Sequence, residues 1–166
     1  MSKLYVDEIT PKTSGTTITF PAGMIVGAEV KEITAESTRS SATSFADDLD
    51  FGSYTPKLTN STVLIQGVAN MDSANSAYCY IKWIVDGTAY VTDGSLRTHG
   101  FYSGTSLNAH GAVPSTIITS VSNTDGSAIS VKCQGSTSTG TLYVNRTATD
   151  SGTGSPSSVM FIEVAN

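Results

Sequence analysis

Apolar and polar residues alternate through two runs in the last third of the chain. Since successive side chains of a β-strand point to opposite faces, this alternation predicts strands with one buried face. Gly, Ser, Thr and Asp fill the stretches between the runs, which favours turns and adds nothing to a core. The apolar set is Ile129, Val131 and Cys133 in residues 127–134, and Leu142 and Val144 in residues 141–147.

The final run, residues 157–164, is apolar on both faces, with Val159 and Phe161 on one face and Met160 and Ile162 on the other. A strand of this kind is expected at the centre of a sheet or covered on both sides. We therefore expect the three runs to form one antiparallel unit with the final strand in its interior. Truncating this strand should then unfold the domain.

Earlier strands are predicted at residues 24–33, 62–69 and 78–85, and Cys79, Ile81, Trp83 and Val85 give the last of these an unbroken apolar face. Asp-Gly pairs follow such runs, and both residues tolerate the positive φ of hairpin turns. About eight to ten short strands without a long helix predict an all-β protein, an antiparallel β-sandwich or jelly roll. The Asp-Gly pairs lie at residues 86–87, 93–94 and 125–126.

Three segments between these runs are predicted to be irregular. Residues 34–44 are expected to form a polar loop, and residues 52–56 are turn-like. Residues 47–50 resemble a calcium loop, but the ligand spacing and the distant Glu of such loops are missing. A solvated acidic turn is the better interpretation.

Residues 1–23 contain two short extended runs, each stopped by a proline. Such pieces cannot bury a core, but they can dock on another subunit by strand addition. We therefore predict an anchoring arm at residues 1–23 and a β-sandwich at residues 24–166; the alternative is an edge hairpin folded on its own domain. The residues expected to anchor the arm are Leu4, Tyr5, Val6, Ile9, Ile18 and Phe20.

The 166 residues fit one domain with an attached arm. The net charge of −5 argues against a nucleic acid as partner. Neutralising phosphates needs clustered Lys and Arg, and the nine basic residues are scattered, so no nucleic-acid partner is expected. No apolar stretch approaches the roughly 18 residues of a membrane span, so no membrane insertion is expected. The N-terminus does not read as a signal peptide, which predicts a protein that is made and retained in a cytoplasm, or that leaves it by lysis rather than secretion.

Reactive side chains are few. Cys79 and Cys133 lie in apolar runs and are expected to be buried free thiols rather than a disulfide. His99 and His110 lie in Gly-rich segments without further metal ligands nearby. No nucleophile elbow is present in the sequence. We predict no catalytic residue, no metal site and no cofactor.

The tyrosines suggest a contact surface. Tyr78, Tyr80 and Tyr143 are predicted on the non-core faces of their strands. Exposed Tyr with Asn and Asp nearby is typical of a sugar-binding surface and equally of a subunit interface, where Tyr is enriched. We favour the interface.

Both ends of the chain resemble a known group of proteins. Residues 3–15 (KLYVDEITPKTSG) with residues 18–23 (ITFPAG), and residues 142–150 (LYVNRTATD) with residues 158–165 (SVMFIEVA), resemble the ends of tail-fibre-like and other virion structural proteins of marine tailed phages, especially cyanobacterial ones. The resemblance implies a virion component, assembled in the host cytoplasm. It also implies a sandwich of jelly-roll or tumour-necrosis-factor-like type, a trimer, and an N-terminal fastening segment. Because the body begins directly after Gly23 without a shaft, a short appendage or a head decoration protein is favoured over a long fibre.

The sequence thus predicts a non-enzymatic virion structural protein, a homotrimer fastened to phage capsid or tail proteins by its arm. The alternative is a module that binds host-surface polysaccharide through loops. Candidate trimer contacts are Tyr80, Tyr143, Met160 and Ile162, and candidate receptor-facing residues are Asp93, Arg97, His99, Phe101, Tyr102 and His110.

Overall fold

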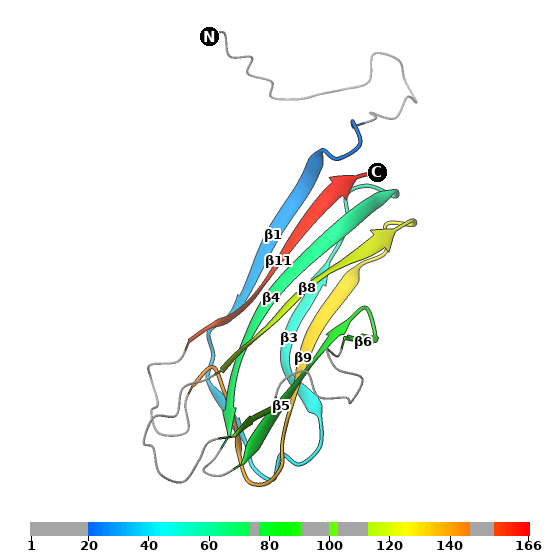
Figure 1. Ribbon diagram of the computed structural model, residues 1–166. Coiled ribbons are helices and arrows are strands. Elements are labelled where there is room, and N and C mark those ends of the chain that lie inside the picture. The colour runs from blue at the N-terminus through cyan, green and yellow to red at the C-terminus, as the bar shows by residue number, and fades with distance from the viewer. Residues whose placement is uncertain (1–19, 74–76, 91–99, 103–112, 147–154) are drawn as a thin grey trace, which may run out of the picture.

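The chain folds into two antiparallel β-sheets packed face to face in a jelly-roll-like sandwich (Figure 1). The computed structural model describes residues 20–73, 77–90, 100–102, 113–146 and 155–166, and no helix occurs in these ranges. The predicted all-β sandwich is therefore confirmed.

The first sheet is organised around its longest strand, β4. Strands β11 and β10 pair with successive parts of β4, whereas β8 pairs along nearly its whole length. Outside them, β1 pairs β11 and β2 pairs β10. The bounds are β1 (Ile25–Ile33), β2 (Ser37–Arg39), β4 (Ser61–Ser73), β8 (Val113–Asn123), β10 (Leu142–Val144) and β11 (Ser157–Ala165).

The second sheet has the order β3-β9-β5-β6, and β7 also pairs β5. Its strands β5 and β6 form a hairpin at the predicted Asp86-Gly87 turn, where φ is 48° and 75° at the two residues. Positive φ at both positions is what this turn requires. The bounds are β3 (Ala46–Tyr54), β5 (Tyr78–Val85), β6 (Thr88–Tyr90), β7 (Gly100–Tyr102) and β9 (Ile129–Thr137).

Strand β11 lies in the interior of the first sheet, between β1 and β4, as predicted (Figure 1). The prediction that the last three runs form one antiparallel unit is wrong. Strand β9 belongs to the second sheet, and β10 and β11 each pair with β4 rather than with each other. The apolar alternation of each strand was correct, but alternation does not specify the partner strand.

The Asp-Gly pair at residues 125–126 does not close a hairpin, contrary to prediction. It lies between β8 of the first sheet and β9 of the second, so the chain crosses from one layer to the other there. The turn is held locally, because Asn123 Oδ1 accepts a hydrogen bond of 2.8 Å from Gly126 N. The pair at residues 93–94 lies outside the described residues.

The segments predicted to be irregular contain strands. Residues 34–44 include β2, and residues 47–54 belong to β3, which has register shifts on both sides of Leu49–Asp50. The acidic run can be extended because basic side chains distant in the sequence form ion pairs with its carboxylates. Arg39 of β2 donates to both carboxylate oxygens of Asp48, at 2.8 and 2.9 Å, and to Gly135 O of β9 at 2.7 Å. Residues 47–50 are therefore part of an edge strand of the second sheet, joined to β2 of the first sheet through Asp48, and not a turn.

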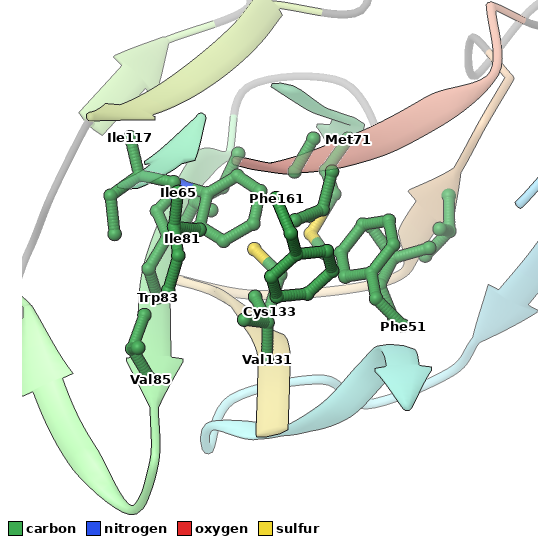
Figure 2. Packing of buried hydrophobic residues seen from close by; sticks show 14 of the residues in the cluster. Phe51, Ile65, Met71, Ile81, Trp83, Val85, Ile117, Val131, Cys133 and Phe161 are labelled. Atoms are coloured by element: carbon green, nitrogen blue, oxygen red, sulfur yellow. The ribbon is translucent and has the colours of Figure 1, made fainter. Parts of the chain in front are cut away.

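The core fills the space between the sheets, and Trp83 is its largest fully buried side chain (Figure 2). The indole stacks on Phe51 with 5.9 Å between ring centres, and its Nε1–H donates to Ser115 Oγ at 3.2 Å. Gly67 of β4 leaves room for the indole, because a Cβ there would lie 2.7 Å from Trp83 Cη2 and 3.0 Å from Ile117 Cγ2. The predicted apolar face of β5 is confirmed, since Cys79, Ile81, Trp83 and Val85 are all buried.

A buried carboxylate ties the first sheet to the segment between β3 and β4. Glu163 is fully buried; its Oε2 accepts hydrogen bonds from Tyr54 Oη and Lys57 N, each at 2.8 Å, and its Oε1 accepts one from Leu58 N at 2.9 Å. Burial by itself raises the pKa of Glu163, but these donated hydrogen bonds outweigh it and leave the pKa below its usual value. Gly27 is part of this arrangement, because a Cβ there would collide with the Tyr54 hydroxyl.

Asn145 joins the ends of several strands. It has a positive φ of 56° and is fully buried. Its side-chain amide donates to Ile33 O at 2.8 Å and to Ala35 O at 3.0 Å, and its Oδ1 accepts a hydrogen bond of 2.5 Å from Ser157 Oγ. Its backbone N–H donates to Asn70 O at 2.9 Å. One residue thus connects the segment after β1 with β4, β10 and β11.

The two cysteines are buried and unpaired, as predicted. Burial raises the pKa of the Cys79 thiol to about 12 and that of the Cys133 thiol well above its usual value. Because the thiolate is the reactive form, we expect a disulfide reagent such as Ellman's to modify neither cysteine in the folded protein at pH 8, and both after unfolding in guanidinium. Rapid release of thionitrobenzoate from the native protein would contradict this placement.

Candidate interaction surface

The outer face of the first sheet carries an apolar surface on β1, β11 and β4, which Ile118 of β8 joins from between Thr116 and Ser120; the four strands lie side by side in Figure 1. Residues directly opposite each other on paired strands share a face, so the register fixes which side chains meet. One row across the four strands is Val30, Met160, Gln66 and Ile118. We call the apolar members of this surface the apolar face: Ile25, Ala28, Val30, Leu64, Val68, Ile118, Met160, Ile162 and Val164.

The apolar face is most exposed on the outer strands β1 and β8 and at Leu64 of the interior strand β4. Ile118 is 82% exposed, Val30 64%, Ile25 60% and Leu64 45%, whereas the residues of β11 between them are half-buried. This arrangement follows from β11 being apolar on both sides, since its odd-numbered residues enter the core and its even-numbered ones face outward. Exposed apolar residues gathered on one sheet face make this surface a candidate interaction site.

Charge is nearly absent from this surface. In the four rows that span β1, β11, β4 and β8, Glu32 is the one charged side chain, and it stands opposite Ser158 at a corner. Removing the apolar face from water would therefore require almost no desolvation of charge, which is the main cost of burying polar surface.

The outer face of the second sheet has the opposite character. Lys132 Nζ lies 2.8 Å from Asp47 Oδ2 and 3.5 Å from Asp50 Oδ2, and Gln134 Nε2 donates to Asp47 Oδ1 at 2.6 Å. The hydrogen bond from Lys132 holds the pKa of Asp47 below its usual value. Nearby, Lys82 Nζ lies 4.5 Å from the ring centre of Phe45. This face is suited to water, so the apolar face distinguishes one side of the sandwich.

The four residues predicted as trimer contacts are divided between the outer faces of the two sheets, and Tyr143 lies on the same side of the first sheet as Met160 and Ile162 but beyond the apolar face. Met160 and Ile162 belong to the apolar face. Tyr80 lies on the outer face of the second sheet and stacks on Tyr78 with 6.2 Å between ring centres. Tyr143 lies on β10, where the Arg146 guanidinium is 5.4 Å from its ring centre. One flat contact can include Met160 and Ile162 but not Tyr80.

Most of the predicted arm and loop residues lie outside the described part of the chain: Leu4, Tyr5, Val6, Ile9, Ile18, Asp93, Arg97, His99 and His110. Phe20 is described and half-buried. Phe101 and Tyr102 belong to β7, where the backbone of Tyr102 stands opposite that of Tyr78, and their side chains are outside the description.

Sequence reasoning missed the exposed members of the apolar face, Ile25, Val30, Leu64 and Ile118. A signal was present for Ile118, because the consecutive isoleucines at 117 and 118 must point to opposite sides of any strand. For the others the sequence did not reveal that β1, β4 and β8 lie beside β11.

The described residues contain neither a metal site nor a membrane-spanning helix. No group of three or more His, Cys, Asp or Glu side chains in these ranges could hold a metal ion. No helix long and apolar enough to cross a membrane is found in the same part of the chain.

The chain is an all-β sandwich with the apolar face on one of its two sheets. No protein-family model and no curated protein match the sequence. Two solved structures are distantly similar. VP2 of infectious bursal disease virus, in a subviral particle, matches with a TM-score of 0.37 and 12% identity over 96% of this chain and 42% of that chain. A chain in the structure of the Gx strain of this virus matches with a TM-score of 0.35 and 16% identity over 98% of this chain and 43% of that chain. The chain thus spans less than half the length of either, and the likeness is confined to a distant similarity of fold.

Proposed function

We propose that the protein is a non-enzymatic structural component of a tailed-phage virion, a homotrimeric surface appendage of the capsid-decoration or short-fibre-knob type. The observation that carries the proposal is the apolar face, because covering a charge-poor sheet surface with exposed Ile and Val by another protein surface is favourable in water. The resemblance of both chain ends to virion structural proteins of marine phages supports the virion as the place where the protein acts.

The structure gives the resembling residues a physical role, which supports this reading. In the LYVNRTATD segment, Leu142 and Val144 are buried in the core and Asn145 holds the ends of neighbouring strands. In the SVMFIEVA segment, Phe161 is buried and Glu163 anchors the segment after β3. These segments are those on which the sandwich depends, so proteins sharing them are expected to share its architecture.

The anchoring arm is proposed to fasten the sandwich to a capsid or tail protein. Gly23 N donates to Ala165 O at 2.8 Å, and Ala165 N donates to Met24 O at 2.9 Å. These bonds fix the start of the body against the end of β11. An arm formed by the preceding residues therefore starts from one end of the sandwich.

Deleting residues 1–20 is expected to abolish attachment to particles while leaving the sandwich folded, because the hydrogen bonds of Gly23 and Met24 are kept. The measurement is a cryo-electron microscopy reconstruction of particles incubated with the full-length or the truncated protein, with thermal unfolding of both as the control. Truncated protein that decorates particles as fully as the intact chain would show that the arm is not the anchor.

The alternative function, binding of host-surface polysaccharide, is favoured by one observation. Tyr78 is an exposed aromatic residue stacked on Tyr80 on the polar outer face of the second sheet, away from the apolar face. Aromatic rings in such a position can stack on sugar rings. The same reconstruction separates the two functions, since density at a fibre tip would favour adsorption and density on the capsid lattice would favour decoration.

A further inference from the structure

The dimensions of the apolar face limit what can cover it. Four strands spaced by about 4.8 Å make a face roughly 19 Å wide, and the six residue steps from 158 to 164 give it a length of roughly 20 Å. Its projected area is then roughly 400 Å², about half of the ~800 Å² that each partner buries in a standard stable interface. A single flat pair of such faces is therefore a weak contact.

Charge favours a second copy of this chain as the occupant. The chain carries a net charge of −5, so two copies repel each other through most of their surfaces. The apolar face is nearly neutral, with Glu32 at one corner, and two copies can meet there without bringing like charges together. An acidic or basic partner would find no complementary charge on it.

Three copies can also cover their apolar faces together. If three faces form the sides of a triangular prism with the strands along its axis, a side of about 19 Å places each face roughly 5–6 Å from the axis. Packed sheets stand about 10 Å apart, so each contributes about 5 Å of side chain. The two values agree, and side chains from three copies would fill the centre while all three faces are covered at once.

We propose that the protein trimerises through the apolar face, with β1 of each copy beside β8 of the next. Under a three-fold axis along the strands, residues of one row stay at one height. Val30 and Ile118 stand at opposite ends of the same row, and both are largely exposed. Val30 of one copy therefore meets Ile118 of the next, while Met160 and Gln66 lie nearer the axis. This inference rests on the homotrimer of the proposed function and adds its surface and its register.

Cysteine cross-linking tests the register. Val30→Cys and Ile118→Cys in one full-length chain are three strands apart, too far for a disulfide within a copy. On mild oxidation we expect a ladder in a non-reducing denaturing gel that ends at the trimer, and no product above the monomer for either single variant. The buried native cysteines stay unreactive. A ladder that ends at the dimer, cross-linking by a single variant, or no intermolecular product overturns the proposal.

Charge insertion tests the surface independently. Leu64→Lys and Ile118→Lys place a cation on the apolar face at exposed positions, so folding should be kept. Sedimentation velocity is expected to show a trimer for the wild-type chain, at least tenfold weaker association for both variants, and no change for Ala89→Lys, which adds the same charge on the exposed outer face of the second sheet. A wild-type monomer, or variants that associate like wild type, overturns the inference. A trimer in solution that is absent from virions would instead contradict the virion role and leave this inference standing.

Discussion

Replacing Gly67 by alanine is expected to lower the free energy of unfolding by about 2 kcal/mol, because the added methyl group has no space in a rigid part of the core. Its Cβ would lie 2.7 Å from Trp83 Cη2 and 3.0 Å from both Trp83 Cζ3 and Ile117 Cγ2. The indole cannot retreat easily, since it stacks on Phe51 and donates to Ser115 Oγ. Urea unfolding followed by tryptophan fluorescence measures the change.

A double-mutant cycle identifies the cause of this loss. Trp83→Phe removes the ring atoms that the new methyl group would meet, so the cavity and the excess volume should cancel in part. We expect Gly67→Ala to cost at least about 1 kcal/mol less in the Trp83→Phe background than in wild type. Circular dichroism follows unfolding in all four proteins. Additive losses would show that contact with the indole is not the cause.

Replacing Glu163 by glutamine is expected to destabilise the fold by roughly 3 kcal/mol, because a fully buried acceptor of three hydrogen bonds becomes a group with a donor of its own. Tyr54 can turn its hydroxyl to accept, but the N–H groups of Lys57 and Leu58 cannot, so one of them is left facing an amide NH₂. The matched control is Glu32→Gln, an exposed carboxylate on β1. The control should stay within about 0.5 kcal/mol of wild type.

The Glu163 carboxylate also predicts how the free energy of unfolding changes at acid pH. The pKa of Glu163 is lower in the folded protein than its ordinary value, so the folded state binds its proton less readily than the unfolded chain does. Its contribution is therefore complete above the unfolded pKa, near 4.3, and is lost as pH falls through the folded pKa. Urea midpoints between pH 7 and pH 3 should fall less steeply for Glu163→Gln than for wild type. Parallel curves would show that Glu163 is not the titrating group.

Strand positions were readable from the sequence where alternation is strict and one face is wholly apolar. Cys79, Ile81, Trp83 and Val85 illustrate this, since a two-residue period of large apolar side chains has one sensible interpretation. The Asp86-Gly87 hairpin was equally predictable, because the tight hairpin turn needs positive φ at both central residues and Asp-Gly adopts it readily.

Long-range pairing was not readable. Residues 47–50 read as an exposed acidic turn because the partner that clamps Asp48 is Arg39 of β2, a strand hidden in a polar segment. Asp125-Gly126 read as a hairpin because nothing local distinguishes a turn within a sheet from a crossing between sheets. Sheet membership is decided by which faces can be buried together, and that is a property of the whole chain.

The apolar face was predictable in part for the same reason. Met160 and Ile162 were recognised because β11 is apolar on both sides, and only one side can enter the core. Tyr80 was predicted to lie with Met160 and Ile162 because all three are on the non-core faces of their strands. The sandwich has two outer faces, however, and alternation does not say to which of them a residue belongs. The placement of β1, β4 and β8 around β11 adds Val30, Leu64 and Ile118.

The central position of β11 has a consequence for how the protein is made. A ribosome releases the strands in chain order, and until residues 157–165 emerge, β1 and β4 have no strand between them. The first sheet then consists of two separate parts, and Glu163, Phe161 and Val159 are missing from the core. Folding of this sandwich must therefore wait for its last strand, and until then the exposed edges of β1 and β4 are open to mispairing with other chains.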